Sequence, residues 1–222
     1  MWRSFHLSSK SGTLSHLILP PQMKKIIFAL LAVFLLTIPS ALAQEGELAS
    51  YQEVYEAGIE FGFFLEQAER RKEMWHDNFE KGSVPEELLD RARAVEGAHY
   101  LLAVAVDGCS DSVNTIPYLA HLANRVDGLE MRLVHPDAGR FIMEANRTPD
   151  GRASTPTVLV LDADFNEVGV FIERPQELQD WALGEGKDLE SRDFMTYKFS
   201  WYDEDLGHQT METVVEILEA TK

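Results

Sequence analysis

The chain has 222 residues, with 37 acidic against 20 basic residues and a formal net charge of −17 at pH 7. A surface with this excess of negative charge repels nucleic acids and anionic lipids, so we expect neither as a partner. Cys109 is the only cysteine, which excludes an internal disulfide framework and leaves packing to stabilise the fold.

The N-terminal segment has the pattern of a secretory signal peptide. Met23-Lys24-Lys25 precedes the apolar run 26–38 and the small residues Ala41-Leu42-Ala43, after which we expect cleavage. The apolar run is shorter than a bilayer requires, which favours a cleaved signal over a retained anchor. We interpret residues 1–22 as the product of an upstream start and residues 23–43 as the signal peptide. The mature protein is then extracytoplasmic: periplasmic if the host has an outer membrane, otherwise secreted, and free of the membrane.

The next segment is predicted to be helical. Apolar residues from Tyr51 to Trp75 follow helical spacing and predict one long amphipathic helix over about residues 48–79. Val84-Pro85-Glu86-Glu87 then begins a second helix, with proline in its first turn, that ends near Gly97. We treat residues 44–97 as a helical extension of the main domain.

Residues 98–222 predict an α/β domain with a closing C-terminal helix. The apolar runs His99–Val106 and Leu129–Val134 are predicted strands, and the predicted helix Ser112–Val126 between them implies parallel neighbours. The remaining pattern predicts a helix over 138–145, a hairpin of strands 157–161 and 168–172, a helix over 177–183, a polar linker over 184–191 and a helix around 211–218.

Cys109 lies where the first of these strands leads into a helix. Unpaired N–H groups and the positive end of a helix dipole favour the thiolate at such a position, which suits a sulfur nucleophile. Ser112 stands three residues on, where a two-cysteine redox centre has its second thiol, so any chemistry must use one sulfur. Asp107 and Asp111 flank the thiol, and their negative charge opposes the dipole.

Other candidate sites are weaker. The histidines beyond residue 43 lack the paired spacing of metal ligands, so we expect no metal and no cofactor. His121 lies more than two helical turns beyond Ser112, which disfavours a Cys-His hydrolase. Asp162 to Asn166 reads as a hairpin turn rather than a calcium loop. In Trp201 to Asp205, we expect the aromatic pair to fill the core and the acids to face water.

Three local features resemble the thioredoxin superfamily, in particular bacterial thioredoxin-family proteins with an N-terminal helical extension. The segment Gly108-Cys109-Ser110-Asp111-Ser112 matches the active-site turn, as a Cys-x-x-Ser variant. Pro117 matches the proline that bends the active-site helix, and Thr155-Pro156 matches the family's cis-proline before the third strand. The resemblance covers about residues 88–181 and implies a thioredoxin-like mixed sheet flanked by helices.

The resemblance also implies roles for these residues. Cys109 would be the attacking thiolate, with Ser112 in place of the resolving cysteine, and a second group would form the substrate-docking edge: Gly108, Asp111, Thr155 and Pro156. The implied partners are protein or peptide thiols and disulfides, together with an external reducing thiol that releases a mixed disulfide. Ala103 occupies the position of the buried acid that manages the proton in thioredoxins.

Two functions therefore remain open from the sequence. The first is a monothiol thiol-disulfide oxidoreductase or isomerase-like factor acting through Cys109. The second is a non-catalytic peptide- or protein-binding module that keeps the docking edge while the chemistry has been lost, as Ser112 and Ala103 would suggest.

Overall fold

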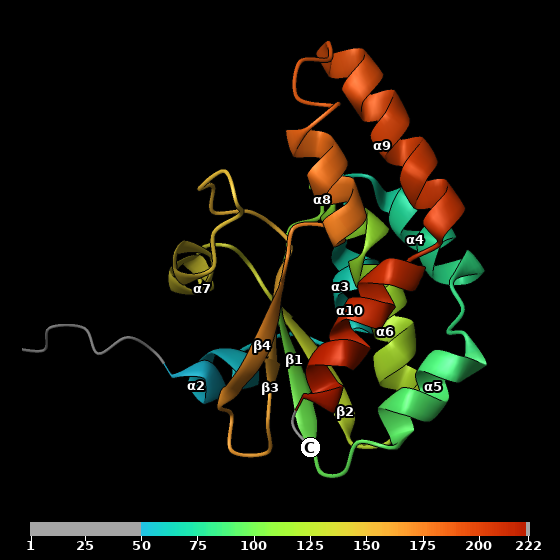
Figure 1. The fold of residues 1–222 in the computed structure, drawn as a ribbon. Helices are drawn as coiled ribbons and strands as arrows, with labels where there is room; N and C mark the ends of the chain where they lie inside the picture. Colours follow the sequence, from blue (N-terminus) through green and yellow to red (C-terminus); the bar gives the residue numbers. More distant parts are fainter. Residues whose placement is uncertain (1–49, 221–222) are drawn as a thin grey trace, which may run out of the picture. The chain divides into compact units, whose positions relative to one another are not determined.

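The centre of the fold is a mixed four-stranded sheet in the order β2-β1-β3-β4 (Figure 1). The computed structural model describes residues 50–220. Strand β1 pairs with β2 in parallel and with β3 antiparallel, and β3 and β4 form the predicted antiparallel hairpin. The strands span His99–Val104 (β1), Leu129–Val134 (β2), Thr157–Leu161 (β3) and Glu167–Ile172 (β4). The predicted fold class, a mixed sheet flanked by helices, is confirmed.

The strand register brings the ends of three strands together. Val104, at the end of β1, pairs with Val134 at the end of β2 and with Thr157 at the start of β3. The chain that leaves β1 and the chain that enters β3 therefore meet at the same end of the sheet. This is the end where Cys109 and the Thr155-Pro156 dipeptide lie.

Helices cover both faces of the sheet. Leu101 and Ala103 of β1 belong to one apolar cluster and Leu102 and Val104 to another, as the alternation of a strand requires. The larger cluster is covered by α3 (Phe61–Gln67), α4 (Lys72–Lys81), α5 (Glu86–Arg93), α6 (Ile116–Arg125) and α10 (His208–Glu219), and the smaller by α2 (Tyr51–Glu56) and α7 (Arg140–Ala145). Figure 1 shows α2 and α7 on one side of the strands and α5, α6 and α10 on the other.

The prediction of one long helix over residues 48–79 is wrong within the described residues. The chain forms α2, α3 and α4 instead, because tertiary contacts interrupt it twice. Ile59 forms a two-bond antiparallel bridge with Leu133 of β2, with N···O distances of 2.9 and 2.8 Å. Arg71, which precedes α4, has a left-handed backbone with φ of 53°. The spacing of apolar residues in the sequence gives no sign of either interruption.

The helix predicted over Ser112–Val126 is divided in two. A 3-10 turn, η1 (Ser112–Asn114), is followed by α6, which begins at Ile116. Pro117 is the second residue of α6, where its missing N–H costs no helical hydrogen bond, whereas in a continuous helix its ring would clash with the carbonyl of Val113. The helix dipole near Cys109 is therefore that of a short turn rather than of a long helix.

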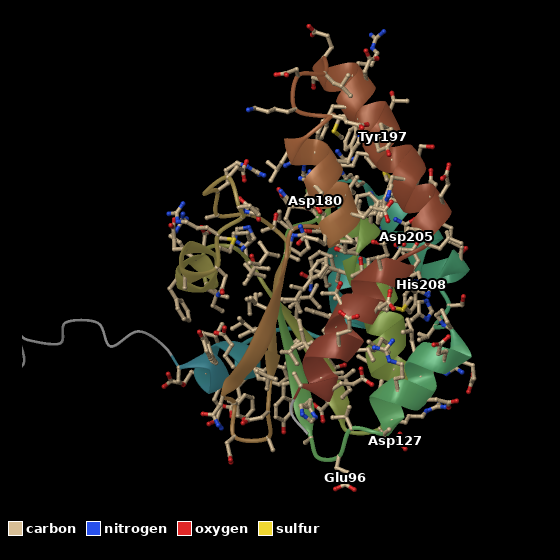
Figure 2. The ribbon with its side chains drawn as sticks, viewed as in Figure 1. Glu96, Asp127, Asp180, Tyr197, Asp205 and His208 are labelled. Atoms are coloured by element: carbon tan, nitrogen blue, oxygen red, sulfur yellow. The ribbon has the colours of Figure 1, made fainter. Side chains whose placement is uncertain are left out.

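Helices α8 (Gln176–Leu183) and α9 (Ser191–Asp205) lie side by side, remote from Glu96 and Asp127 (Figure 2). The helix α8 was predicted, but α9 was not. The buried residues of α9 are Lys198 and Tyr202, so its inward face lacks the apolar period that reveals an amphipathic helix. Of the aromatic pair expected in the core, Tyr202 is buried, with 2% of its surface exposed, whereas Trp201 is only partly buried.

The predicted upstream segment and signal peptide, residues 1–43, lie outside the described residues. Within residues 50–220, no helix combines the length and apolar character needed to cross a membrane. The helices α2 to α5 share the apolar clusters of the sheet, so this part of the predicted extension packs directly on the domain that follows it.

We expect Gly207→Ala to destabilise the fold by about 3 kcal/mol or more, because two costs coincide there. Gly207, at the corner between α9 and α10, has φ of 76°, and an added Cβ would overlap the ring of Tyr118 on α6. Gly151→Ala is the matched control: φ is 84° but no atom lies within 4 Å of the added Cβ. Urea unfolding should show a loss of only about 1 kcal/mol for this control. Equal losses would contradict the close packing of the α9–α10 corner on α6.

Candidate thiol site

Cys109 occupies a tight turn immediately after β1. Its backbone N–H donates to the carbonyl of Val106 at 3.1 Å, and its side chain is partly buried. The thiol Sγ donates to the carbonyl oxygen of Thr155 at 3.1 Å and accepts a hydrogen bond from the backbone N–H of Ser112 at 3.4 Å. The sulfur therefore lies between the turn that carries it and the segment that leads into β3.

The Thr155–Pro156 peptide bond is cis, as the resemblance implied. Pro156 is buried, and its carbonyl accepts a hydrogen bond from the N–H of Glu173 at 2.7 Å. Thr155 is partly exposed, and its own N–H makes no hydrogen bond to any part of the chain between residues 50 and 220. A free backbone donor thus lies directly beside the thiol.

Ser112 contributes its backbone rather than its hydroxyl to the thiol. The residue is fully buried, and its Oγ has no hydrogen-bond partner among the described residues. The N–H at 3.4 Å from Sγ is a donor that favours negative charge on sulfur. A buried serine hydroxyl cannot replace the second thiol of a two-cysteine centre, because it does not form a disulfide.

Asp111 is buried, with 5% of its surface exposed, and both of its carboxylate oxygens are engaged. Oδ2 lies 2.9 Å from Nζ of Lys198, and Oδ1 accepts a hydrogen bond from the Tyr202 hydroxyl at 2.9 Å. Nε of Arg174 lies 3.5 Å from Oδ1. Two cations therefore compensate this charge beside the thiol, and its side chain anchors the turn from within.

The charged cluster continues away from the thiol. Glu173, 4% exposed, pairs with Arg174 at 3.0 Å and with the guanidinium of Arg152 at 2.8 Å. Lys198 also donates to the hydroxyl of Ser110 at 2.8 Å. The sequence gives none of these residues a role in the site: Lys198 belongs to α9, which is not predicted, and Tyr202 is expected only as a core residue.

A second set of contacts holds the turn from the N-terminal helices. The carboxylate of Asp107 accepts hydrogen bonds from the N–H groups of Glu69 and Arg70, at 3.0 and 2.8 Å. Trp75 Nε1 donates to the Asp107 carbonyl at 3.0 Å. Asp107 is therefore a structural acceptor for the chain between α3 and α4.

Gly108 joins the turn to the same chain. Its carbonyl accepts a hydrogen bond from Nε of Arg71 at 3.0 Å. A Cβ at Gly108 would lie 2.7 Å from Cζ of Arg70, so only glycine leaves the Arg70 side chain undisturbed. Because Arg70 is exposed and its guanidinium ends a flexible side chain, an alanine at position 108 would displace it at little cost.

Two buried tyrosines, Tyr202 on α9 and Tyr118 on α6, have raised pKa values. Burial, followed by the charge of Asp111, raises the pKa of Tyr202 well above its ordinary value of 10. Burial also raises the pKa of Tyr118 to about 12, with smaller contributions from Asp203 and Asp205. Both phenols therefore remain protonated at neutral pH, and Tyr202 can donate to Asp111.

The remaining polar motifs have local structural partners. Within residues 50–220, no cluster of three or more metal-ligating side chains is found. His121 lies 2.6 Å from the carbonyl of Phe79 through Nε2, and its ring stacks on Phe79. Asp162 accepts hydrogen bonds from the N–H groups of Asp164 and Asn166, as a hairpin turn requires.

A mixed sheet with a cysteine turn at the end of β1, facing a cis-proline at the start of β3, defines a thioredoxin-like protein. The family model described as thioredoxin matches residues 58–192, and the chain belongs to this family. The match begins within the N-terminal helices and ends at the start of α9.

Two solved structures share this fold at low sequence identity. A Pseudomonas aeruginosa protein of unknown function is 23% identical, with a TM-score of 0.61, over 78% of this chain and 99% of that one. An HIV epitope-scaffold is also 23% identical, with a TM-score of 0.58, over 77% of this chain and 98% of that one. No curated protein matches the sequence. At this level of identity, these structures support the fold alone.

We expect Tyr202→Phe to destabilise the protein by about 2 kcal/mol at neutral pH, because a buried carboxylate loses a hydrogen-bond donor. Tyr118→Phe is the matched control: Tyr118 is also 2% exposed, but its hydroxyl has no hydrogen-bond partner among residues 50–220. Urea unfolding should show a change below about 0.5 kcal/mol for the control. Equal effects would contradict a specific role for the bond to Asp111.

The same variant should change the response to alkaline pH. The raised pKa of Tyr202 means that the folded protein holds this proton more tightly than the unfolded chain does. Its contribution to stability is complete below pH 10, the ordinary tyrosine value, and is lost as pH rises through the folded-state pKa. Stability above pH 10 should therefore fall less steeply in Tyr202→Phe than in the unmodified protein. An unchanged slope would contradict the raised pKa.

Proposed function

We propose that this protein is an exported monothiol thiol-disulfide exchange factor in which Cys109 is the attacking thiolate. The observation that supports this best is the 3.1 Å approach of Sγ to the Thr155 carbonyl, beside the cis Thr155–Pro156 bond. The thiol is partly exposed and receives the Ser112 N–H, and the two neighbouring carboxylates have other partners. A sulfur in this setting can meet a disulfide in an incoming chain.

The proposed substrate is a protein or peptide disulfide held in an extended conformation. Thr155 offers its free N–H to a substrate backbone carbonyl, and its carbonyl, released by the thiol, can accept from a substrate N–H. Proline at position 156 has no N–H of its own to compete. The substrate disulfide would then lie against Sγ of Cys109.

Each step of the proposed exchange breaks one disulfide bond and forms another, so no added oxidant is needed. The Cys109 thiolate attacks one substrate sulfur, forming a mixed disulfide, and the other substrate sulfur leaves as a thiolate that takes a proton from water. A second thiolate then attacks the substrate sulfur of the mixed disulfide and regenerates the Cys109 thiolate. If this thiolate belongs to the substrate, the result is a rearranged disulfide; if it belongs to an external thiol, the substrate leaves bonded to that thiol.

Export is part of the proposal. Residues 23–43 have the signal-peptide pattern, and disulfide substrates persist outside the cytoplasm, in the periplasm or the secreted space. The proposed setting has neither nucleic acid nor membrane as a partner, in keeping with the net charge of −17.

A non-catalytic docking module is the second candidate function. Ala103 is fully buried in β1 where thioredoxins have a buried acid, and Ser112 replaces the second thiol. Under this alternative the Thr155 edge binds an extended peptide and Cys109 takes no part in chemistry.

Trapping of a mixed disulfide distinguishes the two functions. We expect the folded protein, mixed with a disulfide-bonded peptide and quenched with acid, to carry the peptide on Cys109, the only cysteine, as seen by mass spectrometry. Ser112→Ala should retain this capture, because its hydroxyl has no hydrogen-bond partner among the described residues, whereas Cys109→Ser should abolish it. Ser112→Cys should close an internal disulfide and catalyse reduction of the peptide by dithiothreitol.

The controls use the unfolded state and peptide affinity. Alkylation of Cys109 should proceed in the folded protein as well as in urea, because the thiol is only partly buried. No capture, together with peptide binding that is unchanged in Cys109→Ser, would establish the docking module and refute the exchange reaction.

A further inference from the structure

A separate cavity lies between α8, α9 and the loop before Thr155. Its volume is about 480 Å³, within the range of small-molecule sites. Gln179 of α8, Phe194 of α9 and the guanidinium-bearing residues Arg152 and Arg174 line it. Figure 2 shows the two helices beside each other, with Asp180 on α8 and Tyr197 on α9. The thiol turn is not among the lining residues, so this cavity is distinct from the peptide edge proposed above.

The cavity gathers positive charge in a strongly acidic protein. Arg152, Arg174 and Lys187 line it, against one lining carboxylate, Asp150. Glu173 forms ion pairs with both arginines, and Asp111 forms ion pairs with Arg174 and Lys198.

Lys187 is the cationic lining residue that has no carboxylate partner within residues 50–220. It is also exposed. Its ammonium group is therefore free to meet an anion at the mouth of the cavity. Three cationic residues against one carboxylate in the lining contrast with the net charge of −17 on the whole chain, so the cavity favours anions.

Gln179 forms a buried part of the cavity wall. The residue is 4% exposed and lines the cavity, yet neither its amide nitrogen nor its amide oxygen has a hydrogen-bond partner in residues 50–220. Leaving buried polar atoms unpaired costs about 1–3 kcal/mol each. Both amide atoms are fully buried, so this cost falls on the fold rather than on an occupant of the cavity.

The remaining wall is apolar. Ala182 and Leu183 of α8 and the ring of Phe194 line the cavity beside the polar groups. An inorganic anion would leave this surface uncovered, whereas an organic acid would bury it. We propose that the cavity binds a small organic carboxylate, with its apolar body against Leu183 and Phe194 and its carboxylate directed to Lys187 and Arg174.

Calorimetric titration with 3-phenylpropionate tests this proposal on the full-length protein. We expect this acid to bind and its neutral amide, 3-phenylpropionamide, to bind at least about tenfold more weakly, because a charge-assisted hydrogen bond is lost. Inorganic phosphate should bind more weakly than the acid, since it leaves the apolar wall bare. Equal binding of the acid and its amide, or tighter binding of phosphate, would overturn the proposal.

Two variants locate the binding. Lys187→Gln should weaken binding of 3-phenylpropionate about tenfold without unfolding, because the residue is exposed. Gln179→Leu should leave the affinity unchanged and the stability in urea unchanged or raised, since it removes two unpaired buried atoms that do not face the cavity. Lys81→Gln is the matched control, because Lys81 pairs with Asp203 and does not line the cavity. Affinity unchanged in Lys187→Gln, or no binding at millimolar concentration, would refute the site.

Discussion

The position of the thiol turn depends on the buried carboxylate of Asp111. A carboxylate taken out of water must be met by cations and hydrogen-bond donors, and removing one of them leaves an uncompensated charge. Here Lys198 and Tyr202 come from α9 and Arg174 from the chain after β4. The turn, the last strand and a C-terminal helix are therefore fixed together. On the other side of the thiol turn, the carboxylate of Asp107 accepts hydrogen bonds from the N–H groups of Glu69 and Arg70. Two independent sets of contacts therefore hold Cys109 in position.

Much of the fold could be predicted because the strands and most helices have regular apolar periods. The four strands were found to within two residues, since each alternates or is wholly apolar between turn residues. The long N-terminal helix was wrong because its breaks come from Ile59 pairing with Leu133 and from the left-handed backbone of Arg71. Helix α9 was missed because its buried residues are Lys198 and Tyr202. These polar side chains are buried because both bind the carboxylate of Asp111.

The candidate site was predictable only where it is local. The turn around Cys109 and the Thr155–Pro156 dipeptide have sequence signatures, and the strand register brings them together. The pairing of Asp111 with Lys198 joins residues 87 positions apart, and no spacing rule connects them. A flanking aspartate therefore looks exposed and repulsive in the sequence, although its charge is compensated in the fold.

The bridge between Ile59 and Leu133 also covers part of an edge of the sheet. Strand β2 is an outermost strand, and a bare outermost strand offers its amides to any neighbouring chain, which invites aggregation. A single residue pair, followed directly by α3, occupies that border of the sheet with two hydrogen bonds. This isolated bridge, which is too short to count as a strand, obstructs the pairing of a strand from another chain along β2.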